Sequence, residues 1–221
     1  MRESRVLLAA FALATVVDLV SLAVGSDAGH MTAKPLLMPL LAAHAARGGA
    51  PRLLLAALLC GWGGDVLLLS DAQPAFMAGM ACFAAGHVCY LVLFRGYGPA
   101  RAGGGLLAPG YAVTLVVTIA LLWPDLPAGL RVPIACYSTL LTAMAYGAAV
   151  RLGLVAGLGG ALFMLSDTLI ATGIAAWPQP PRPDLWIMLT YALAQSLLVR
   201  GTLRERPAPA TAYREVRSTT P

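Results

Sequence analysis

The chain has 221 residues, of which 59% are hydrophobic and only 11% carry charge, and its mean hydropathy is +0.77. Soluble domains average about 25% charged residues, so this composition excludes an ordinary soluble protein and predicts an integral membrane protein. The net charge of +5 does not indicate nucleic-acid binding, because the basic residues stand singly at the ends of apolar runs and not in a stripe with aromatic residues.

Apolar runs bounded by charges, glycines and prolines predict eight membrane helices. A bilayer core of roughly 30 Å needs about 20 apolar residues per crossing, so a chain of this length has room for little else. We expect an all-α membrane protein with one eight-helix domain over 1–204 and a disordered tail over 205–221. In chain order, the predicted helices are 6–24, 35–46, 53–70, 75–95, 106–123, 132–150, 154–176 and 184–202.

Two of these segments are unusual. Segment 6–24 also has features of a signal peptide, but its apolar stretch is longer than usual, and keeping it gives an even number of crossings. Segment 35–46 is short and carries Pro35 and Pro39, which predicts a tilted, kinked or sheltered helix.

The basic residues predict the orientation of the helices. If the N-terminus is cytoplasmic, twelve of the fifteen basic residues fall on the cytoplasmic side, and only Lys34, Arg131 and Arg182 fall outside. Such asymmetry sets the orientation by the positive-inside rule, so both termini are expected in the cytoplasm.

Among the acidic residues and histidines, Asp65, His87 and Asp167 fall deep inside predicted helices. A charge at mid-bilayer costs roughly 2.5 to 3.5 kcal/mol, so such a group usually faces a partner or a wet cavity. With a rise of about 1.5 Å per residue, both aspartates lie roughly 18 to 20 Å from the inner ends of their helices, and His87 reaches a similar plane. They form either one acid/base centre or separate hydrogen-bonded struts between helices, and the common depth favours the shared centre.

Other polar groups are compatible with more than one role. The ammonium group of Lys34, directly before Pro35, either projects into a cavity toward an anion or anchors the helix at the interface. Asp18 lies near the outer end of its helix, where structural, solvated and catalytic roles are all open, and His30 has no predicted role. The chain has no HxxxH, HExxH or CxxC spacing, so we predict no metal site.

Five stretches carry a resemblance to a known family: KPLLMPLL at 34–41, GDVLLL at 64–69, FAAGHVCY at 83–90, GGALFMLSD at 159–167 and YALAQSLLVR at 191–200. They fall in order across most of the chain and in the expected helices. Together they resemble the YhhN/TMEM86 family of multi-spanning membrane proteins, whose characterised animal members are lysoplasmalogenases.

The resemblance implies an eight-helix enzyme that cleaves the vinyl-ether bond of a lysoplasmalogen. The products would be a fatty aldehyde and glycerophosphoethanolamine or glycerophosphocholine. Family members can carry an amide at the position of Asp167, so an obligatory role for this residue is not implied. Matched by motif, the functional positions are Lys34, Asp65, His87, Tyr90, Asp167 and Gln195, and we add Tyr137 to the substrate-binding set.

The implied chemistry needs an acid, an anion and a water molecule, and no cofactor. A carboxyl group that holds its proton in an apolar site is a suitable general acid, and a second carboxylate can stabilise a cation and orient water, as in glycosidases. We assign Asp65 as the acid and Asp167 as its partner, with His87 and Tyr90 tuning them. Lys34 would attract the phosphate of the lysophospholipid substrate.

The alternative is a proton-coupled transporter of a lipid or small solute that uses the same carboxylates. Helices interrupted by proline, and the GG-x5-SD pattern that occurs at both 63–71 and 159–167, are compatible with a transporter. A third reading is a lipid-binding or structural membrane protein. The bias toward Ala, Gly, Leu, Pro and Arg is typical of a GC-rich bacterial genome, so we expect the plasma membrane of a bacterium. The sequence predicts no oligomeric state.

Overall fold

The computed structural model describes residues 2–101 and 104–205. These residues form eight α-helices, one short 3-10 helix and no strand, which confirms the all-α class. The elements are α1 (Arg2–Val24), α2 (Asp27–Arg47), α3 (Arg52–Leu67), α4 (Gln73–Arg95), η1 (Gly104–Leu107), α5 (Ala108–Leu122), α6 (Ala128–Leu152), α7 (Leu154–Ile174) and α8 (Pro183–Arg204).

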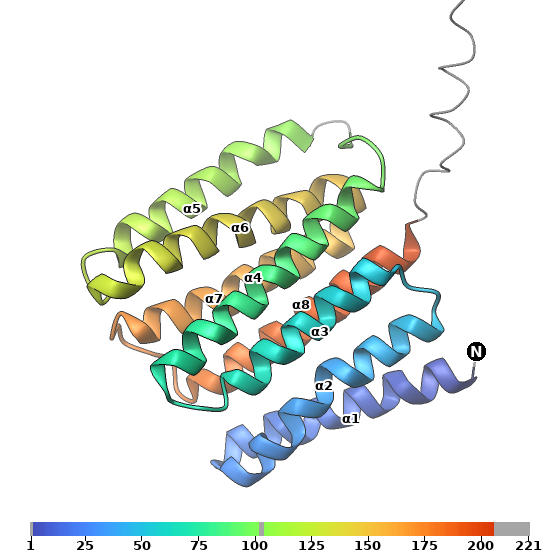
Figure 1. Ribbon diagram of the computed structural model, residues 1–221, viewed down its shortest axis with the longest axis horizontal. Coiled ribbons are helices and arrows are strands. Elements are labelled where there is room, and N and C mark those ends of the chain that lie inside the picture. The colour runs from blue at the N-terminus through green and yellow to red at the C-terminus, as the bar shows by residue number, and fades with distance from the viewer. Residues whose placement is uncertain (1, 102–103, 206–221) are drawn as a thin grey trace, which may run out of the picture.

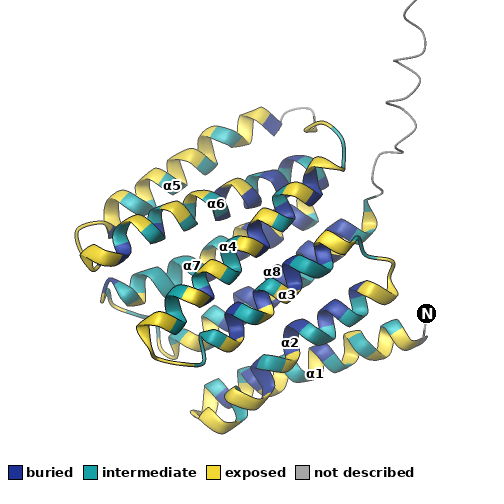
Figure 2. Cartoon of the chain, viewed as in Figure 1, coloured by how far each residue is buried: buried dark blue, intermediate teal, exposed yellow. Residues whose placement is uncertain are grey.

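The helices run up and down along a common direction, with α5 at one edge of the bundle and α1 and α2 at the other (Figure 1). Helix α7 packs against α8 and α6, and α3 packs against α4 and α2. Figure 2 shows buried residues concentrated on the central helices, whereas α1 and α5 are largely exposed. The centre of the bundle is therefore made by α3, α4, α6, α7 and α8.

The two ends of the bundle differ in charge. Helix α1 begins and α8 ends at the same end, which we call the basic end (Figure 1). The connections at the other end, which we call the opposite end, join α1 to α2, α3 to α4, α5 to α6 and α7 to α8. The basic end and its neighbouring helical turns carry Arg5, Arg47, Arg52, Arg95, Arg101, Arg151, Arg200 and Arg204.

Five helical segments are long and apolar enough to cross a membrane: α1, α4, η1 with α5, α6 and α7. Helix α3 has only 16 residues, α2 buries Lys34, and α8 buries the polar side chains Thr190, Gln195 and Thr202. Large apolar side chains on α1 and α5, such as Val24 and Val116, point outward. An apolar outer surface is what a lipid environment requires, and the chain is a multi-pass membrane protein.

The predicted start of the second helix was wrong. Helix α2 begins at Asp27, eight residues before Pro35, because Ser26 caps it: the Ser26 hydroxyl oxygen accepts the Gly29 N–H at 3.3 Å. Both Pro35 and Pro39 lie inside the helix. Helix α6 likewise begins at Ala128, before its internal Pro133, and α3 ends at Leu67, three residues before the predicted end.

Glycines allow the central helices to approach closely. A Cβ atom on Gly160 of α7 would lie 2.7 Å from the Cα of Ala145 on α6. On α8, a Cβ atom on Gly201 would lie 2.7 Å from the Cβ of Ala156 on α7. Contacts this short exclude any side chain, so small residues set the helix spacing, as is common where helices pack within a membrane.

The predicted tail lies almost entirely outside the described residues, since only Glu205 of 205–221 is described. The Glu205 carboxylate pairs with the Arg101 guanidinium at 2.6 Å, and this contact is exposed at the basic end.

Candidate active site

A cavity lies in the half of the bundle that is farther from the basic end. Its volume is about 1130 Å³ when its open part is included. The two aspartates singled out by depth, Asp65 of α3 and Asp167 of α7, both line it, and so does Lys34 of α2. The rest of the wall is mostly apolar and includes Leu68, Phe76, Met80, Phe83, Ile119 and Leu122. A cavity with apolar walls and a few convergent polar groups is typical of a small-molecule or lipid site.

Asp65 is held by a chain of hydrogen bonds that runs along α8. The hydroxyl of Tyr191 donates to Asp65 Oδ2 at 2.8 Å. Gln195 Nε2, one helical turn further along α8, donates to the Tyr191 oxygen at 3.4 Å, and the hydroxyl of Tyr90 donates to Gln195 Oε1 at 2.7 Å. Three donors in series thus end on one carboxylate oxygen and fix its orientation.

Asp167 ends a second chain, which comes from α6 and α4. The hydroxyl of Tyr137 donates to Asp167 Oδ2. His87 Nε2 lies 3.1 Å from the same hydroxyl oxygen. Because the hydroxyl proton is directed to Asp167, His87 Nε2 is the donor of that bond. The histidine therefore acts on the carboxylate only through Tyr137.

Each carboxylate keeps one oxygen free for the cavity. No hydrogen bond among the described residues reaches Oδ1 of Asp65 or of Asp167, and neither atom is among those sealed inside the protein. Asp65 is only 2% exposed, whereas Asp167 is half-buried. The two acids thus present free oxygens to one space, Asp65 in the more enclosed part of it.

Aromatic rings separate the two chains of hydrogen bonds. Phe163 packs edge-on against Tyr191 with ring centroids 5.4 Å apart, and against His87 at 4.9 Å. Phe83 packs against both Phe163 and Tyr191. A Cβ atom on Gly64 would lie 2.5 Å from the Phe83 ring, so glycine is required there for the ring to fit. This packing holds Tyr191 and His87 in place on two sides of Phe163.

Lys34 is buried and lines the cavity, and none of the ion pairs among the described residues involves it. An ammonium group has three N–H donors, and those of Lys34 are available to a polar ligand in the cavity.

The structure groups the predicted residues into two layers. Asp65, Asp167, Lys34 and Tyr137 line the cavity, whereas His87, Tyr90 and Gln195 do not and lie behind the tyrosines. His87 is fully buried, and its Nδ1 has no partner among the described residues.

Sequence reasoning missed Tyr191 as a site residue, although its spacing from Gln195 places both on one face of α8. It also missed Arg131, which lines the cavity. The only hint in the sequence was that Arg131 is a basic residue that does not lie at the basic end.

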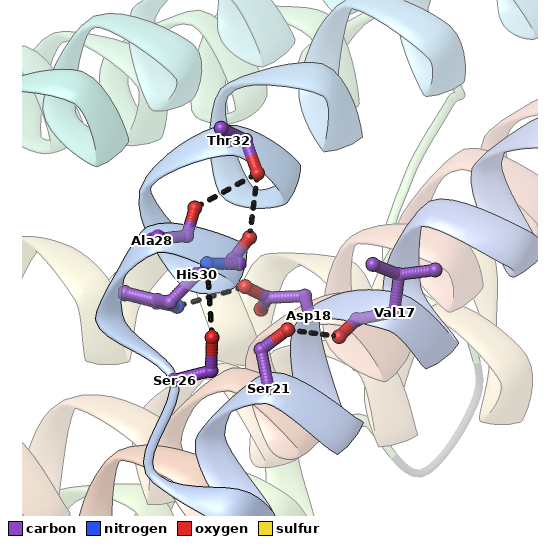
Figure 3. A network of polar contacts seen from close by, with 8 residues as sticks. Val17, Asp18, Ser21, Ser26, Ala28, His30 and Thr32 are labelled. Carbon is purple, nitrogen blue, oxygen red and sulfur yellow. Dashed lines mark hydrogen bonds and ion pairs between the residues drawn. The ribbon is translucent and has the colours of Figure 1, made fainter.

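A second buried acid lies elsewhere, between α1 and α2 (Figure 3). Asp18 is 1% exposed, and its Oδ1 lies 2.7 Å from His30 Nδ1. Its Oδ2 is sealed inside the protein without a partner among the described residues. A Cβ atom on Gly29 would lie 2.2 Å from the Ser21 hydroxyl, so the two helices touch at this point. Asp18 does not line the cavity that holds Asp65.

Comparison with known proteins gives a consistent result. The model of the YhhN family matches residues 29–202. Lysoplasmalogenase TMEM86B of Homo sapiens is 40% identical over 167 residues, which cover 74% of this chain and 69% of that protein. Lysoplasmalogenase TMEM86B of Sus scrofa is 38% identical over 162 residues, covering 73% and 68%, and lysoplasmalogenase TMEM86A of Bos taurus is 31% identical over 161 residues, covering 68% and 65%. No solved structure matches the chain.

Proposed function

The chain belongs to the YhhN family, and on that premise we propose that it is a hydrolase that cleaves the vinyl-ether bond of a lysoplasmalogen. The observation that carries the proposal is the pair of carboxylates, Asp65 and Asp167, that share one largely apolar cavity. A lipid chain needs the apolar wall, and vinyl-ether hydrolysis needs the acids.

The proposed reaction begins with proton transfer to carbon. Asp65 gives its proton to the vinyl carbon distal to the ether oxygen, which leaves an oxocarbenium ion. Water adds to that ion to form a hemiacetal, which collapses to a fatty aldehyde and the glycerol hydroxyl of glycerophosphoethanolamine or glycerophosphocholine. One water is consumed, and the acid recovers its proton from that water.

Asp167 is the proposed partner that orients the water and stabilises the cation. Its greater exposure supports this division of roles, because the attacking water must reach it. Tyr137 and Tyr191 each donate to one oxygen of a carboxylate and so direct the free oxygen toward the substrate. His87, Tyr90 and Gln195 are proposed to position these tyrosines, and Lys34 to bind the polar part of the substrate.

We also propose that all eight helices of one domain, 1–204, cross the membrane with both termini in the cytoplasm. The concentration of arginines at the basic end supports this orientation. The cavity then lies in the outer half of the bilayer. The bacterial plasma membrane remains our proposal for the location, on composition.

Purified protein in detergent, given a lysoplasmalogen, tests the function through the release of fatty aldehyde. Wild type and Asp71→Asn are expected to release it at similar rates, and Asp65→Asn about 10²- to 10⁴-fold more slowly. Asp71 is a matched control because it is an exposed aspartate just beyond the same helix. No aldehyde from wild type, together with uptake of the lipid into sealed vesicles only under a proton gradient, would overturn the proposal in favour of the transporter.

A further inference from the structure

Arg131 occupies a place in the cavity that the proposed reaction does not use. It lies in the first turn of α6 and lines the outer part of the cavity, nearest the opposite end, together with Trp123 and Leu126. The side chain is half-buried. A guanidinium group in such a place has a large desolvation cost unless it has acceptors.

The described residues accept only some of the hydrogen bonds that the guanidinium group can donate. Arg131 Nε donates to the Leu126 carbonyl at 3.1 Å, and Nη2 donates to the Pro124 carbonyl at 3.1 Å. A guanidinium group has five N–H donors in a fixed plane, so three remain, including both on Nη1. The two backbone bonds fix the plane of the group in advance, which lowers the cost of binding an anion with the free donors.

No carboxylate in the part of the chain that the structure describes neutralises Arg131. None of the ion pairs among the described residues involves it. The nearest acid in the sequence, Asp125, accepts a hydrogen bond from Trp177 Nε1 at 2.7 Å and does not line the cavity. The other cation of the cavity, Lys34, comes from α2. In the outer part of the cavity, Arg131 is therefore a cation that no ion pair among the described residues neutralises.

The depth of Arg131 matches the geometry of a glycerophospholipid. Arg131 lies three residues from the opposite end of α6, and Asp167 lies seven residues from the same end of α7. At about 1.5 Å per residue, Arg131 is roughly 6 Å nearer the membrane surface than Asp167. That separation is comparable to the span of the glycerol unit between an ether oxygen and the phosphate. Lys34 lies seven residues into α2, at about the level of Asp167.

We propose that Arg131 binds the phosphodiester of the lysophospholipid headgroup and so holds the ether oxygen at the level of the two aspartates. The proposal rests on the proposed function for the identity of the lipid. In this arrangement Arg131 binds the phosphate, and Lys34 binds the glycerol hydroxyl or the region around the ether oxygen, deeper in the cavity. Guanidinium groups bind phosphate oxygens with two parallel N–H bonds, which also fixes the orientation of the lipid.

Binding of two lipids that cannot be cleaved tests the site. The first is a lysophospholipid with a saturated 1-O-alkyl chain, and the second is the 1-O-alkylglycerol without the phosphate. Each is titrated into wild-type protein in nanodiscs and followed by tryptophan fluorescence, since Trp123 lines the cavity. Arg131→Gln is expected to raise the dissociation constant of the lysophospholipid about tenfold or more and to leave that of the alkylglycerol unchanged.

Arg182→Gln is the matched control, because Arg182 lies at the same end of the bundle, donates to the Leu22 carbonyl and does not line this cavity. It is expected to change neither dissociation constant. Arg131→Lys keeps the charge without the planar fork, and a smaller loss confined to the lysophospholipid is expected; this variant also serves if Arg131→Gln does not fold. Glycerophosphocholine, which has the phosphate and no chain, is expected to bind much more weakly than the lysophospholipid.

Several results would overturn the proposal: equal losses for both lipids in Arg131→Gln, no loss for either, or a phosphate-dependent loss in Lys34→Gln and not in Arg131→Gln. Glycerophosphocholine binding as tightly as the lysophospholipid would also overturn it, in favour of a free phosphodiester as ligand. A wild type that shows the phosphate-dependent binding but releases no aldehyde from a lysoplasmalogen would support this site and overturn the proposed function.

Discussion

Two regions of this protein bury aspartates, and they differ in what surrounds the second carboxylate oxygen. At Asp18, one oxygen contacts His30 and the other is sealed between α1 and α2 (Figure 3). At Asp65, one oxygen accepts the Tyr191 hydroxyl and the other is left to a cavity. Both residues are at most 2% exposed. Burial alone therefore does not identify a catalytic acid, and access to a cavity is the distinguishing feature.

The difference also separates two uses of a buried polar group. The contact between Asp18 and His30 joins two helices that already touch at Gly29, as a strut does. Asp65 and Asp167 come from helices separated by aromatic rings, and each ends a chain of hydrogen bonds that begins further inside the protein. Such chains orient a group without occupying all of its acceptors.

The largest expected effect is on the two cavity acids. Asp65→Asn and Asp167→Asn keep the shape of the side chain and remove the transferable proton or the negative charge. General acid-base groups contribute about 10²- to 10⁴-fold, so kcat/KM for aldehyde release is expected to fall within that range for Asp65→Asn. A fall of similar size in Asp18→Asn would contradict the distinction between the two regions.

A smaller effect is expected at Tyr191. Tyr191→Phe removes the hydrogen bond to Asp65 while the ring stays packed between Phe83 and Phe163. Asp65 becomes negatively charged as its proton moves to the substrate, and a hydrogen bond to a charged group contributes about 1.5–3 kcal/mol, so kcat is expected to fall about tenfold to a hundredfold, with little change in lipid binding. Tyr90→Phe is the control, since its hydroxyl reaches Asp65 only through Gln195 and Tyr191, and the loss there is expected to be smaller.

The apolar wall of the cavity predicts a further effect on substrate binding. Ile119→Trp on α5 places a large ring in the cavity, and overpacking costs about 1–3 kcal/mol, so KM is expected to rise about tenfold with kcat little changed. Val117→Trp on the exposed side of the same helix is the control and is expected to leave KM unchanged. Equal KM values for the two variants would show that the lipid does not bind against α5.

The smallest effect on activity is expected at Asp18. Asp18→Ala removes the contact with His30 and is expected to lower stability by about 1–3 kcal/mol, seen as a lower melting temperature in detergent, with kcat/KM close to that of wild type. His30→Ala leaves the buried carboxylate with no partner and is expected to lower the melting temperature further. Normal stability together with lost activity in Asp18→Ala would place Asp18 in the catalytic machinery.

The sequence predicted the helices best where apolar runs end at strong signals. Helix α4 ends at Arg95 and α7 begins at Leu154, both as predicted. The start of α2 was missed because Lys34 and Pro35 resemble a helix start, whereas Ser26 provides the real cap. Proline lacks the N–H of an interior helix residue, yet Pro35, Pro39 and Pro133 all lie inside helices.

The site was predictable only in its depth. Counting residues placed Asp65 and Asp167 at one level, and both line one cavity. The prediction that His87 shares this level was wrong: it lies eight residues from the Arg95 end of α4, about 12 Å, whereas each aspartate lies thirteen residues from the same end of its helix, about 20 Å. His87 reaches Asp167 only through Tyr137. The direction in which each side chain points could not be read from helices that are apolar on all sides, because such helices lack the periodicity that marks an inner face. Tyr191 and Arg131 were missed for this reason.

The most direct test of protonation at the vinyl carbon is the reaction carried out in ¹⁸O-labelled water, with the released aldehyde trapped at once by reduction and weighed by mass spectrometry. If proton transfer to carbon gives an oxocarbenium ion that water captures, the aldehyde released by the wild-type enzyme will carry the ¹⁸O label and the glycerol product will carry none. Label in the glycerol hydroxyl and none in the aldehyde would show that water attacks the glycerol carbon, and it would contradict the proposed roles of Asp65 and Asp167.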